Sequence, residues 1–122
     1  MKTKTFILII ALFAISLNVD AQLKGKKFQL DVGEMGTFNL EFKEKTYELS
    51  NSEGYVVVIG DYKIEDNIVF FTDREGEMAC LDGEIGRYKF SVENKELKLE
   101  LIEDNYQGRP TMASRVWKQV NE

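Results

Sequence analysis

Histidine is absent from this sequence of 122 residues, and cysteine, proline and tryptophan each occur once. Without histidine there can be no Ser–His or Cys–His nucleophile pair and no imidazole ligand for a metal ion. The single cysteine, Cys80, has no basic neighbour in sequence that would favour its reactive thiolate form. We therefore expect no catalytic residues, and we expect the protein not to be an enzyme.

Carboxylates are plentiful in the segment from Asp73 to Glu84, but they do not follow a recognised metal-binding spacing. A calcium loop of the helix–loop–helix type needs oxygen ligands at set positions around a glycine, and this segment lacks that order. The segment is either a weak ion site or a solvated acidic loop. We expect the solvated loop, and hence no metal and no cofactor.

The sequence also lacks an excess of basic residues. Its 16 lysines and arginines are outnumbered by 21 aspartates and glutamates, which gives a formal net charge of −5. Nucleic-acid binding requires lysine and arginine to neutralise phosphates, so this composition argues against a nucleic-acid partner. It is equally unsuited to anionic membrane surfaces.

No apolar run in the sequence is long enough to cross a membrane as a helix. The run from Phe6 to Leu17 follows a short basic segment and is shorter than the roughly 20 residues that a span needs. Ala21 then offers a small residue where a signal peptidase would cut. We expect a signal peptide over residues 1–21 and a secreted or periplasmic domain over 22–122, with no membrane span after cleavage.

In an oxidising compartment, Cys80 cannot form an internal disulfide because it has no partner cysteine in the chain. It is either buried or joined to another molecule. Burial is the expectation, since a free cysteine behaves as a small apolar residue.

The chain beyond residue 22 shows strand patterns and turns, with no convincing amphipathic helix. Apolar and polar residues alternate from Phe28 to Val32 and from Phe38 to Phe42, which is typical of half-buried strands. The continuous apolar run Tyr55–Ile59 ends at Gly60, which we expect to form a bend or bulge. We also expect a turn of helix near Met78–Cys80 and a final strand over Met112–Val120.

Gly-x-Tyr begins two similar hairpins, at Gly60 and at Gly86. Residues that flank a two-residue turn pair symmetrically, so each turn fixes the register of its hairpin. Turns at residues 44–45, 66–67 and 94–95 place apolar residues opposite apolar residues in every case. The predicted pairs are Phe42 with Tyr47, Leu40 with Leu49, Ile64 with Val69, Tyr62 with Phe71, Val92 with Leu97, Phe90 with Leu99, and Tyr88 with Leu101.

Together these patterns give about eight strands in sequential hairpins, which indicates an antiparallel meander. Such a meander removes its exposed edges by closing into an up-and-down barrel, and eight strands leave room for side chains or one small ligand. The fold class is therefore expected to be all-β, an antiparallel up-and-down barrel. An open sandwich is the alternative.

The second half of the chain resembles a bacterial secreted lipocalin-like domain of the calycin group. The residues that carry the resemblance are Gly60-x-Tyr62, Val69-x-Phe71-Thr72, Ala79-Cys80, Gly86-x-Tyr88, Leu97–Leu101, Asp104, Gly108-Arg109 and Trp117. Relatives of this type often carry a second cysteine just before the Gly-Arg pair, where this chain has Tyr106. The resemblance implies a barrel that binds a small, often apolar molecule, with the fold alone leaving the function open.

A small apolar ligand would contact the inward side chains of the hairpins and the residues near the barrel end. The candidate ligand-binding residues are Phe42, Tyr62, Phe71, Tyr88, Phe90, Leu99, Arg109 and Trp117. The alternative is that the aromatic residues simply fill the core, as a domain of about a hundred residues requires. Arg109 is either a cap that bonds Asp104 or backbone carbonyls, or a ligand contact; the cap is favoured.

A second function remains open, that of a non-catalytic interaction or inhibitor module of the cell envelope. The register points Ile68 and Phe70 away from the barrel interior, whereas the second hairpin is polar on its outer face. These two side chains are either covered by another segment or form a contact surface for a protein partner.

Overall fold

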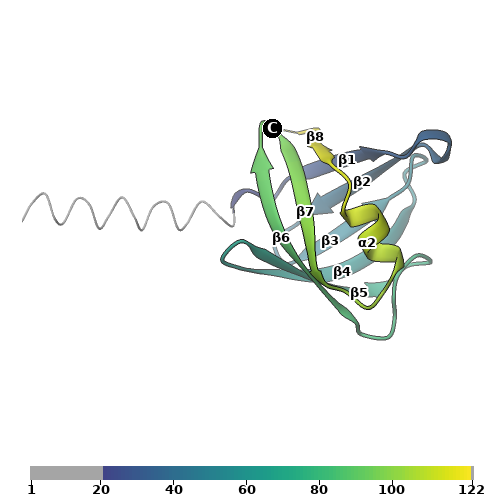
Figure 1. Cartoon of the computed structure of the whole chain (residues 1–122). Coiled ribbons are helices and arrows are strands. Elements are labelled where there is room, and N and C mark those ends of the chain that lie inside the picture. The colour runs from purple at the N-terminus through teal and green to yellow at the C-terminus, as the bar shows by residue number, and fades with distance from the viewer. Residues whose placement is uncertain (1–20, 122) are drawn as a thin grey trace, which may run out of the picture.

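The chain folds into a closed antiparallel barrel of eight strands, shown in Figure 1. The structure is a computed structural model that describes residues 21–121, so the predicted signal peptide lies outside the described residues except for Ala21. The strands are β1 (Lys27–Asp31), β2 (Thr37–Phe42), β3 (Thr46–Ser50), β4 (Val56–Glu65), β5 (Ile68–Glu75), β6 (Ile85–Glu93), β7 (Glu96–Glu103) and β8 (Trp117–Gln119). The predicted all-β barrel is confirmed, and the sandwich alternative is wrong because β8 closes the sheet onto β1.

The three hairpin registers deduced from the sequence are confirmed pair by pair. Phe42 lies opposite Tyr47, Tyr62 opposite Phe71, and Phe90 opposite Leu99, with the other four predicted pairs also present. A slip of one residue would turn every apolar side chain of a strand from the core to solvent, which is why the pattern specified the register so strongly. One expectation within this set fails: Leu101 faces Tyr88 but remains 46% exposed.

The turn of the β6–β7 hairpin holds two residues in the left-handed region, Asn94 with φ 54° and Lys95 with φ 64°. Positive φ at both central residues is the signature of the type I′ turn, which matches the twist of the two strands. Asparagine tolerates this conformation, whereas the Cβ of lysine is crowded there.

Replacing Lys95 with glycine is therefore expected to raise the free energy of unfolding by about 0.5–1 kcal/mol, since relief of the crowding exceeds the entropy that glycine adds to the unfolded chain. Thermal unfolding of the purified domain measures the change. Lys98→Gly, at an exposed position inside β7, is the control and is expected to be destabilising. A lower melting temperature for Lys95→Gly would contradict the turn assignment.

Two register shifts interrupt the pairing of the long strand β4 with its neighbours. Val57 and Val58 are both buried although they are adjacent, because the register with β3 shifts between Leu49 and Ser50. A second shift falls between Ile59 and Gly60, next to the glycine where a bend or bulge is expected, but the extra residue is Arg74 on the partner strand β5. Bulges increase the local twist of a strand and help a sheet to close.

The segment after β7 differs from the prediction. A short helix, α2 (Gly108–Ala113), replaces the first part of the strand expected over Met112–Val120, and β8 retains only Trp117–Gln119. Pro110 is compatible with this helix because it lies in the first turn, where backbone N–H groups have no intrahelical acceptor. A 3-10 turn, η1 (Gly33–Met35), connects β1 to β2.

The turn of helix expected near Met78–Cys80 is not formed. Ala79 donates its backbone N–H to the carbonyl of Gly76 in a simple turn, and Met78 donates to the carbonyl of Val57. Cys80 is buried and free, so the expectation of a buried thiol is confirmed.

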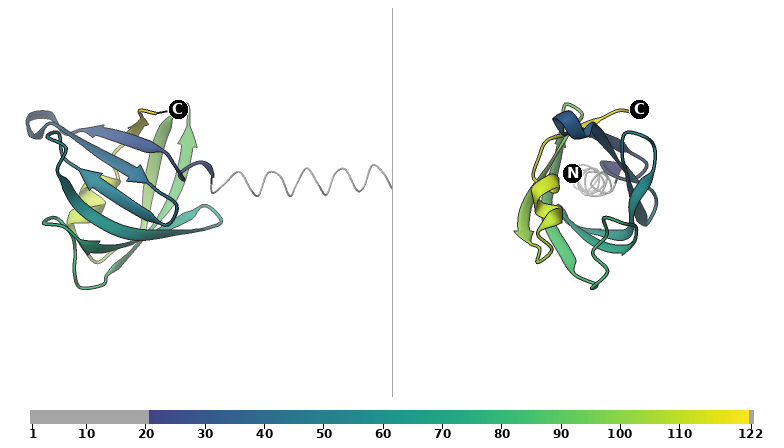
Figure 2. Two further views of the ribbon diagram at one scale, coloured as in Figure 1. Left: turned by 180° about the vertical axis from the view of Figure 1, so that it is seen from behind. Right: turned by 90° about the vertical axis from the view of Figure 1, so that its right-hand side faces the viewer.

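Buried side chains from all eight strands form the core of the barrel. Phe42 packs edge-on against Phe28 and Tyr62, with ring centroids 6.0 Å and 5.0 Å apart, and Phe71 links Tyr47 to Tyr88. Leu23 is fully buried beside the β2–β3 turn, where Gly25 donates to the carbonyl of Phe42. The helix α2 lies at the other end of the barrel, on the side that faces the viewer in the right-hand view of Figure 2.

Candidate functional site

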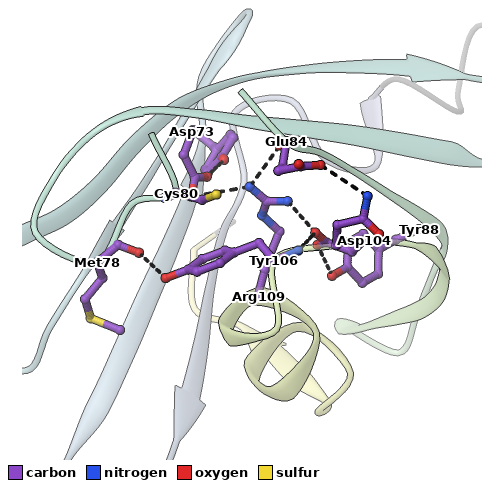
Figure 3. A network of polar contacts seen from close by, with 10 residues as sticks. Asp73, Met78, Cys80, Glu84, Tyr88, Asp104, Tyr106 and Arg109 are labelled. Atoms are coloured by element: carbon purple, nitrogen blue, oxygen red, sulfur yellow. Dashed lines mark hydrogen bonds and ion pairs between the residues drawn. The ribbon is translucent and has the colours of Figure 1, made fainter. Parts of the chain in front are cut away.

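Arg109 lies between two buried aspartates at the α2 end of the barrel, as Figure 3 shows. Its Nη1 atom is 2.9 Å from Oδ1 of Asp104, and its Nη2 atom is 3.4 Å from Oδ2 of Asp73. The side chains are 10%, 0% and 4% exposed for Arg109, Asp104 and Asp73. One guanidinium thus joins the end of β5 to the segment that follows β7.

Each aspartate also accepts a hydrogen bond from a tyrosine and from a backbone N–H group. Tyr47 donates its hydroxyl to Asp73, and Tyr88 donates its hydroxyl to Asp104 at 2.6 Å. The amides of Cys80 and Tyr106 donate to Asp73 and Asp104 at 2.9 Å and 3.0 Å. Each oxygen of the two carboxylates therefore has at least one partner, as buried polar groups usually do.

The same arginine holds the loops at this end of the barrel. Its Nη2 group donates to the carbonyl of Glu84 at 3.4 Å, and its guanidinium carbon lies 5.6 Å from the centroid of the Tyr106 ring. Tyr106 in turn donates its hydroxyl to the carbonyl of Met78 at 3.1 Å. These contacts with Asp104 and a backbone carbonyl match those of the cap that the sequence favoured.

The network perturbs its own ionisable groups. Burial works against the charged form of Arg109, but Asp73 and Asp104 outweigh it, and the pKa of the guanidinium is raised. Burial raises the pKa of Tyr47 far above its usual value, and the hydrogen bond to Asp73 adds to the shift. The pKa of Tyr88 is raised in the same way by burial and by Asp104.

These tyrosine shifts predict that stability falls in alkali. Below about pH 10, Tyr47 and Tyr88 are neutral whether the chain is folded or unfolded, so their contribution is constant. Above that pH, the unfolded chain loses protons that the folded chain retains, and the free energy of unfolding should fall by up to about 1.4 kcal/mol per pH unit for each tyrosine. Denaturant unfolding across this pH range measures the slope.

Tyr47→Phe is expected to reduce that slope. Tyr55→Phe is the comparison variant, because Tyr55 is 67% exposed and lies outside the network. Near-ultraviolet absorbance provides a second readout, in which at least two of the five tyrosines stay un-ionised until the fold is lost. Ionisation of all five in the folded protein near pH 10 would contradict the prediction.

The two repeated glycines make room for this network. A Cβ on Gly60 would lie 2.4 Å from the carbonyl oxygen of Thr72 and 2.6 Å from the Tyr47 ring and hydroxyl. A Cβ on Gly86 would lie 2.5 Å from Oδ2 of Asp104 and 2.7 Å from Nη1 of Arg109. The glycine of each Gly-x-Tyr motif thus lets the network pack against the strand backbone. Gly60 makes room for Tyr47, which bonds Asp73, and Gly86 makes room for Asp104.

A cavity of about 120 Å³ lies beside the network at the α2 end of the barrel. Its walls are mostly apolar side chains from the strands, the loop at Met78 and the helix α2. The lining residues are Leu40, Leu49, Val58, Phe71, Asp73, Met78, Leu99, Tyr106, Gly108, Arg109, Met112, Ala113 and Trp117. The Arg109–Asp73 pair provides the charged part of this lining.

Trp117 is the most deeply buried large side chain of the cavity wall, with 2% of its surface exposed. Its indole Nε1 is buried and has no hydrogen-bond partner among residues 21–121. A buried donor without an acceptor is rare and energetically costly, so this atom requires an explanation.

No protein-family model matches the chain, and no curated protein or solved structure is significantly similar to it. The closed eight-stranded antiparallel barrel is consistent with a calycin-like fold. The functional argument therefore has to come from the site itself.

The candidate ligand-binding residues separate into two groups in the structure. Phe71, Leu99, Arg109 and Trp117 line the cavity. The other four, Phe42, Tyr62, Tyr88 and Phe90, are buried in the barrel core, and Tyr62 also borders a separate surface depression near the β2–β3 turn. Four of the candidate residues thus lie where a ligand in the cavity would contact them, and the other four fill the core.

Ile68 and Phe70 point outward on β5 and are half-buried. Phe70 lies opposite Lys63 on one side and Arg87 on the other, and Nζ of Lys63 is 5.0 Å from its ring centroid. The stems of such long cationic side chains can cover apolar surface. The assignment of an interaction surface to this pair stays a prediction.

Sequence reasoning missed Asp73, Tyr106 and the α2 residues Met112 and Ala113 as parts of the site. The sequence predicts a solvated acidic loop from Asp73 onward, but Asp73 is the last buried residue of β5, two positions after the inward Phe71. Continuing that alternation along β5 would have indicated an inward aspartate.

Within residues 21–121, no three His, Cys, Asp or Glu side chains are grouped so that they could hold a metal ion. The described residues also contain no helix long and apolar enough to span a membrane.

Proposed function

We propose that this protein binds a small, partly apolar molecule in the cavity beneath α2, and that it acts as an exported lipocalin-like binding protein. The observation that carries the proposal is the cavity of about 120 Å³ within a closed barrel, lined mainly by apolar side chains. Binding sites for small molecules are typically apolar concavities with a few placed polar groups. Arg109 and Asp73 are the charged groups of this lining.

The size of the cavity supports a compact ligand. An apolar cavity of about 150 Å³ holds a benzene molecule, whereas sites for drug-sized ligands have about 300–1,000 Å³. A cavity of about 120 Å³ suits a group of similar or smaller size than benzene, or one end of a longer molecule.

The exported location rests on the sequence of residues 1–21. A basic start, a short apolar run and a small residue before the cut are typical of signal peptides. In this proposal, the mature protein begins at Gln22 and meets its ligand outside the cytoplasm.

Native mass spectrometry of the protein purified from the exporting cell tests both parts. We expect a mass that lacks residues 1–21, together with a second species that carries a small bound molecule. A cavity-filling variant, Ala113→Leu, should lose the bound species because Ala113 is buried in the cavity wall. Ser114→Leu is the matched control, since Ser114 is exposed at the next position of the chain.

Retention of the same bound molecule by Ala113→Leu would place the ligand elsewhere and contradict the proposed site. Failure of every compact apolar compound to bind the purified wild-type protein would contradict the proposed function. Trp117 is the only tryptophan and lines the cavity, so its fluorescence reports occupancy of the cavity directly.

A further inference from the structure

The large apolar side chains that stay exposed gather at the α2 end of the barrel. Alternate connections of an up-and-down barrel lie at the same end, so segments 32–36, 51–55, 76–84 and 104–116 share the α2 end, on the right-hand side of Figure 1. Ten large apolar side chains are exposed among residues 21–121, and nine of them lie in these segments or within three residues of them. The nine are Met35, Tyr55, Val56, Met78, Leu81, Ile85, Leu101, Ile102 and Val116.

Three of these side chains are mostly exposed, and they come from three different connections. Met35 is 69% exposed, and Tyr55 and Leu81 are each 67% exposed. Single exposed apolar side chains are normal on a protein surface, but their concentration at one end marks a site of interaction. At the opposite end, Val120 is the one large apolar side chain among residues 21–121 that is exposed.

Charge is divided between the same two ends. The four segments at the α2 end contain six acidic residues, two arginines and no lysine, which gives a formal charge of −4. The segments at the opposite end contain five lysines and two acidic residues, which gives a formal charge of +3. These opposite segments are 21–26, 43–45, 66–67, 94–95 and 120–121. At the α2 end, Asp104 and Arg109 pair with each other, which leaves five carboxylates and Arg115 around the exposed apolar side chains.

The combination of apolar and acidic groups selects among the possible occupants of this surface. An anionic lipid surface is repelled by the carboxylates, and a neutral lipid surface gives them no counter-charge. A second copy that met the same end would bring two negative surfaces together. A second copy that met it with the opposite end would supply lysines but, apart from Val120, no exposed large apolar side chain. A polypeptide with both apolar and basic side chains matches the surface in both respects.

We propose that the α2 end of the barrel is a docking surface for a basic, amphipathic segment of another polypeptide. The apolar side chains of that segment pack on Met35, Tyr55 and Leu81, and its lysines or arginines face the surrounding carboxylates. None of these three residues lines the cavity, so the docking surface is separate from the proposed small-molecule site and does not depend on it.

Fluorescence anisotropy with labelled peptides tests the proposal on the purified protein. The probe is an amphipathic peptide of about 15 residues built from leucine and lysine. One control peptide has glutamate in place of lysine, and the other has serine in place of leucine. We expect the leucine–lysine peptide to bind at least about tenfold tighter than either control peptide.

Two sets of variants locate the surface. A triple variant with Met35→Ser, Tyr55→Ser and Leu81→Ser should bind the leucine–lysine peptide about tenfold more weakly, because it loses the most exposed apolar contacts. It should fold normally, since all three side chains lie at the surface, and it should keep any molecule bound in the cavity. Val120→Ser is the matched control at the opposite end and should bind the peptide as the wild-type protein does.

Charge reversal separates the local field from the net charge. Glu53→Lys combined with Asp82→Lys, at the α2 end, should weaken binding of the leucine–lysine peptide about fivefold. Glu44→Lys combined with Glu65→Lys changes the net charge equally at the opposite end and should have a much smaller effect. Equal losses in the two double variants would contradict docking at the α2 end.

Four other results would overturn the proposal. Equal binding of the leucine–lysine and serine–lysine peptides would show attraction by charge alone. Binding to anionic or zwitterionic lipid vesicles that is lost in the triple variant would assign the surface to a membrane. A dimer in sedimentation analysis that is lost in the triple variant would assign it to a second copy of the chain. Failure of the leucine–lysine peptide to bind would remove the docking surface and leave the proposed small-molecule function standing.

Discussion

Replacing Arg109 with methionine is expected to lower the free energy of unfolding by about 3–5 kcal/mol. The guanidinium is 10% exposed and lies between Asp73 and Asp104, which are 4% and 0% exposed. Its removal leaves two buried carboxylates without their cation, and a buried charge without a partner is far more costly than a lost surface contact. For a domain of this size, the loss corresponds to a melting temperature lower by more than about 12 °C.

Two further variants separate charge imbalance from lost packing. Adding Asp73→Asn and Asp104→Asn to Arg109→Met removes both carboxylate charges, and we expect this triple variant to recover most of the lost stability. Arg87→Met is the matched surface control, because the Arg87–Glu103 pair is half-exposed on both sides and should contribute at most about 1 kcal/mol. A cost for Arg109→Met no larger than that for Arg87→Met would contradict the role assigned to the buried bridge.

Substitution of Gly60 by alanine is expected to have the second largest effect, a loss of about 3 kcal/mol. The added Cβ would lie 2.4 Å from the backbone carbonyl oxygen of Thr72, which cannot move without displacing β5. It would also lie 2.6 Å from Tyr47, whose hydroxyl bonds Asp73. The substitution therefore disturbs the strand pairing and the buried network together.

Denaturant unfolding measures this loss, and Gly108→Ala is the control. Gly108 begins α2 at an exposed position, and its nearest obstacle is the Tyr106 ring at 3.1 Å. Alanine has the higher helix propensity, so this variant should be neutral or slightly stabilising. Similar losses for Gly60→Ala and Gly108→Ala would show that the close approach at Gly60 is not the cause.

The hairpins could be predicted from the sequence because their information is local. Each two-residue turn fixes a register, and the apolar residues agree with only one phase of a period of two. The burial of Leu101 is wrongly predicted because it depends on a distant strand rather than on its own hairpin. Its partner Tyr88 is buried, but β8 pairs with β7 only at Glu96 and Leu97, so the far end of β7 has less cover.

The helix α2 escaped prediction because its sequence gives weak and conflicting signals. Gly108 and Pro110 are helix breakers in most positions, and a six-residue helix is too short to show a periodic pattern. Such a helix gains its stability from tertiary contacts, here from the buried Ala113 and from Arg109 in the network.

The buried network could be predicted only in part. The resemblance and the Gly-Arg-Pro turn drew attention to Arg109 and its pairing with Asp104. The pairing with Asp73 joins residues 36 positions apart, and nothing in the sequence distinguishes Asp73 by composition from the other acids of its segment. Only the closed barrel brings these side chains together. The existence of a cavity depends on how side chain volumes fit, which no period or motif encodes.

The shortness of β8 has a consequence for how quickly the cavity can exchange its contents. This strand makes two residue pairs with β1 and two with β7, whereas β6 and β7 share seven. Local opening requires the least free energy where strand pairing is least. We therefore expect β8 to separate from β1 and β7 more often than the whole barrel unfolds. Trp117 lies on that strand and in the cavity wall, so each opening of β8 would also expose the cavity that we propose as the binding site.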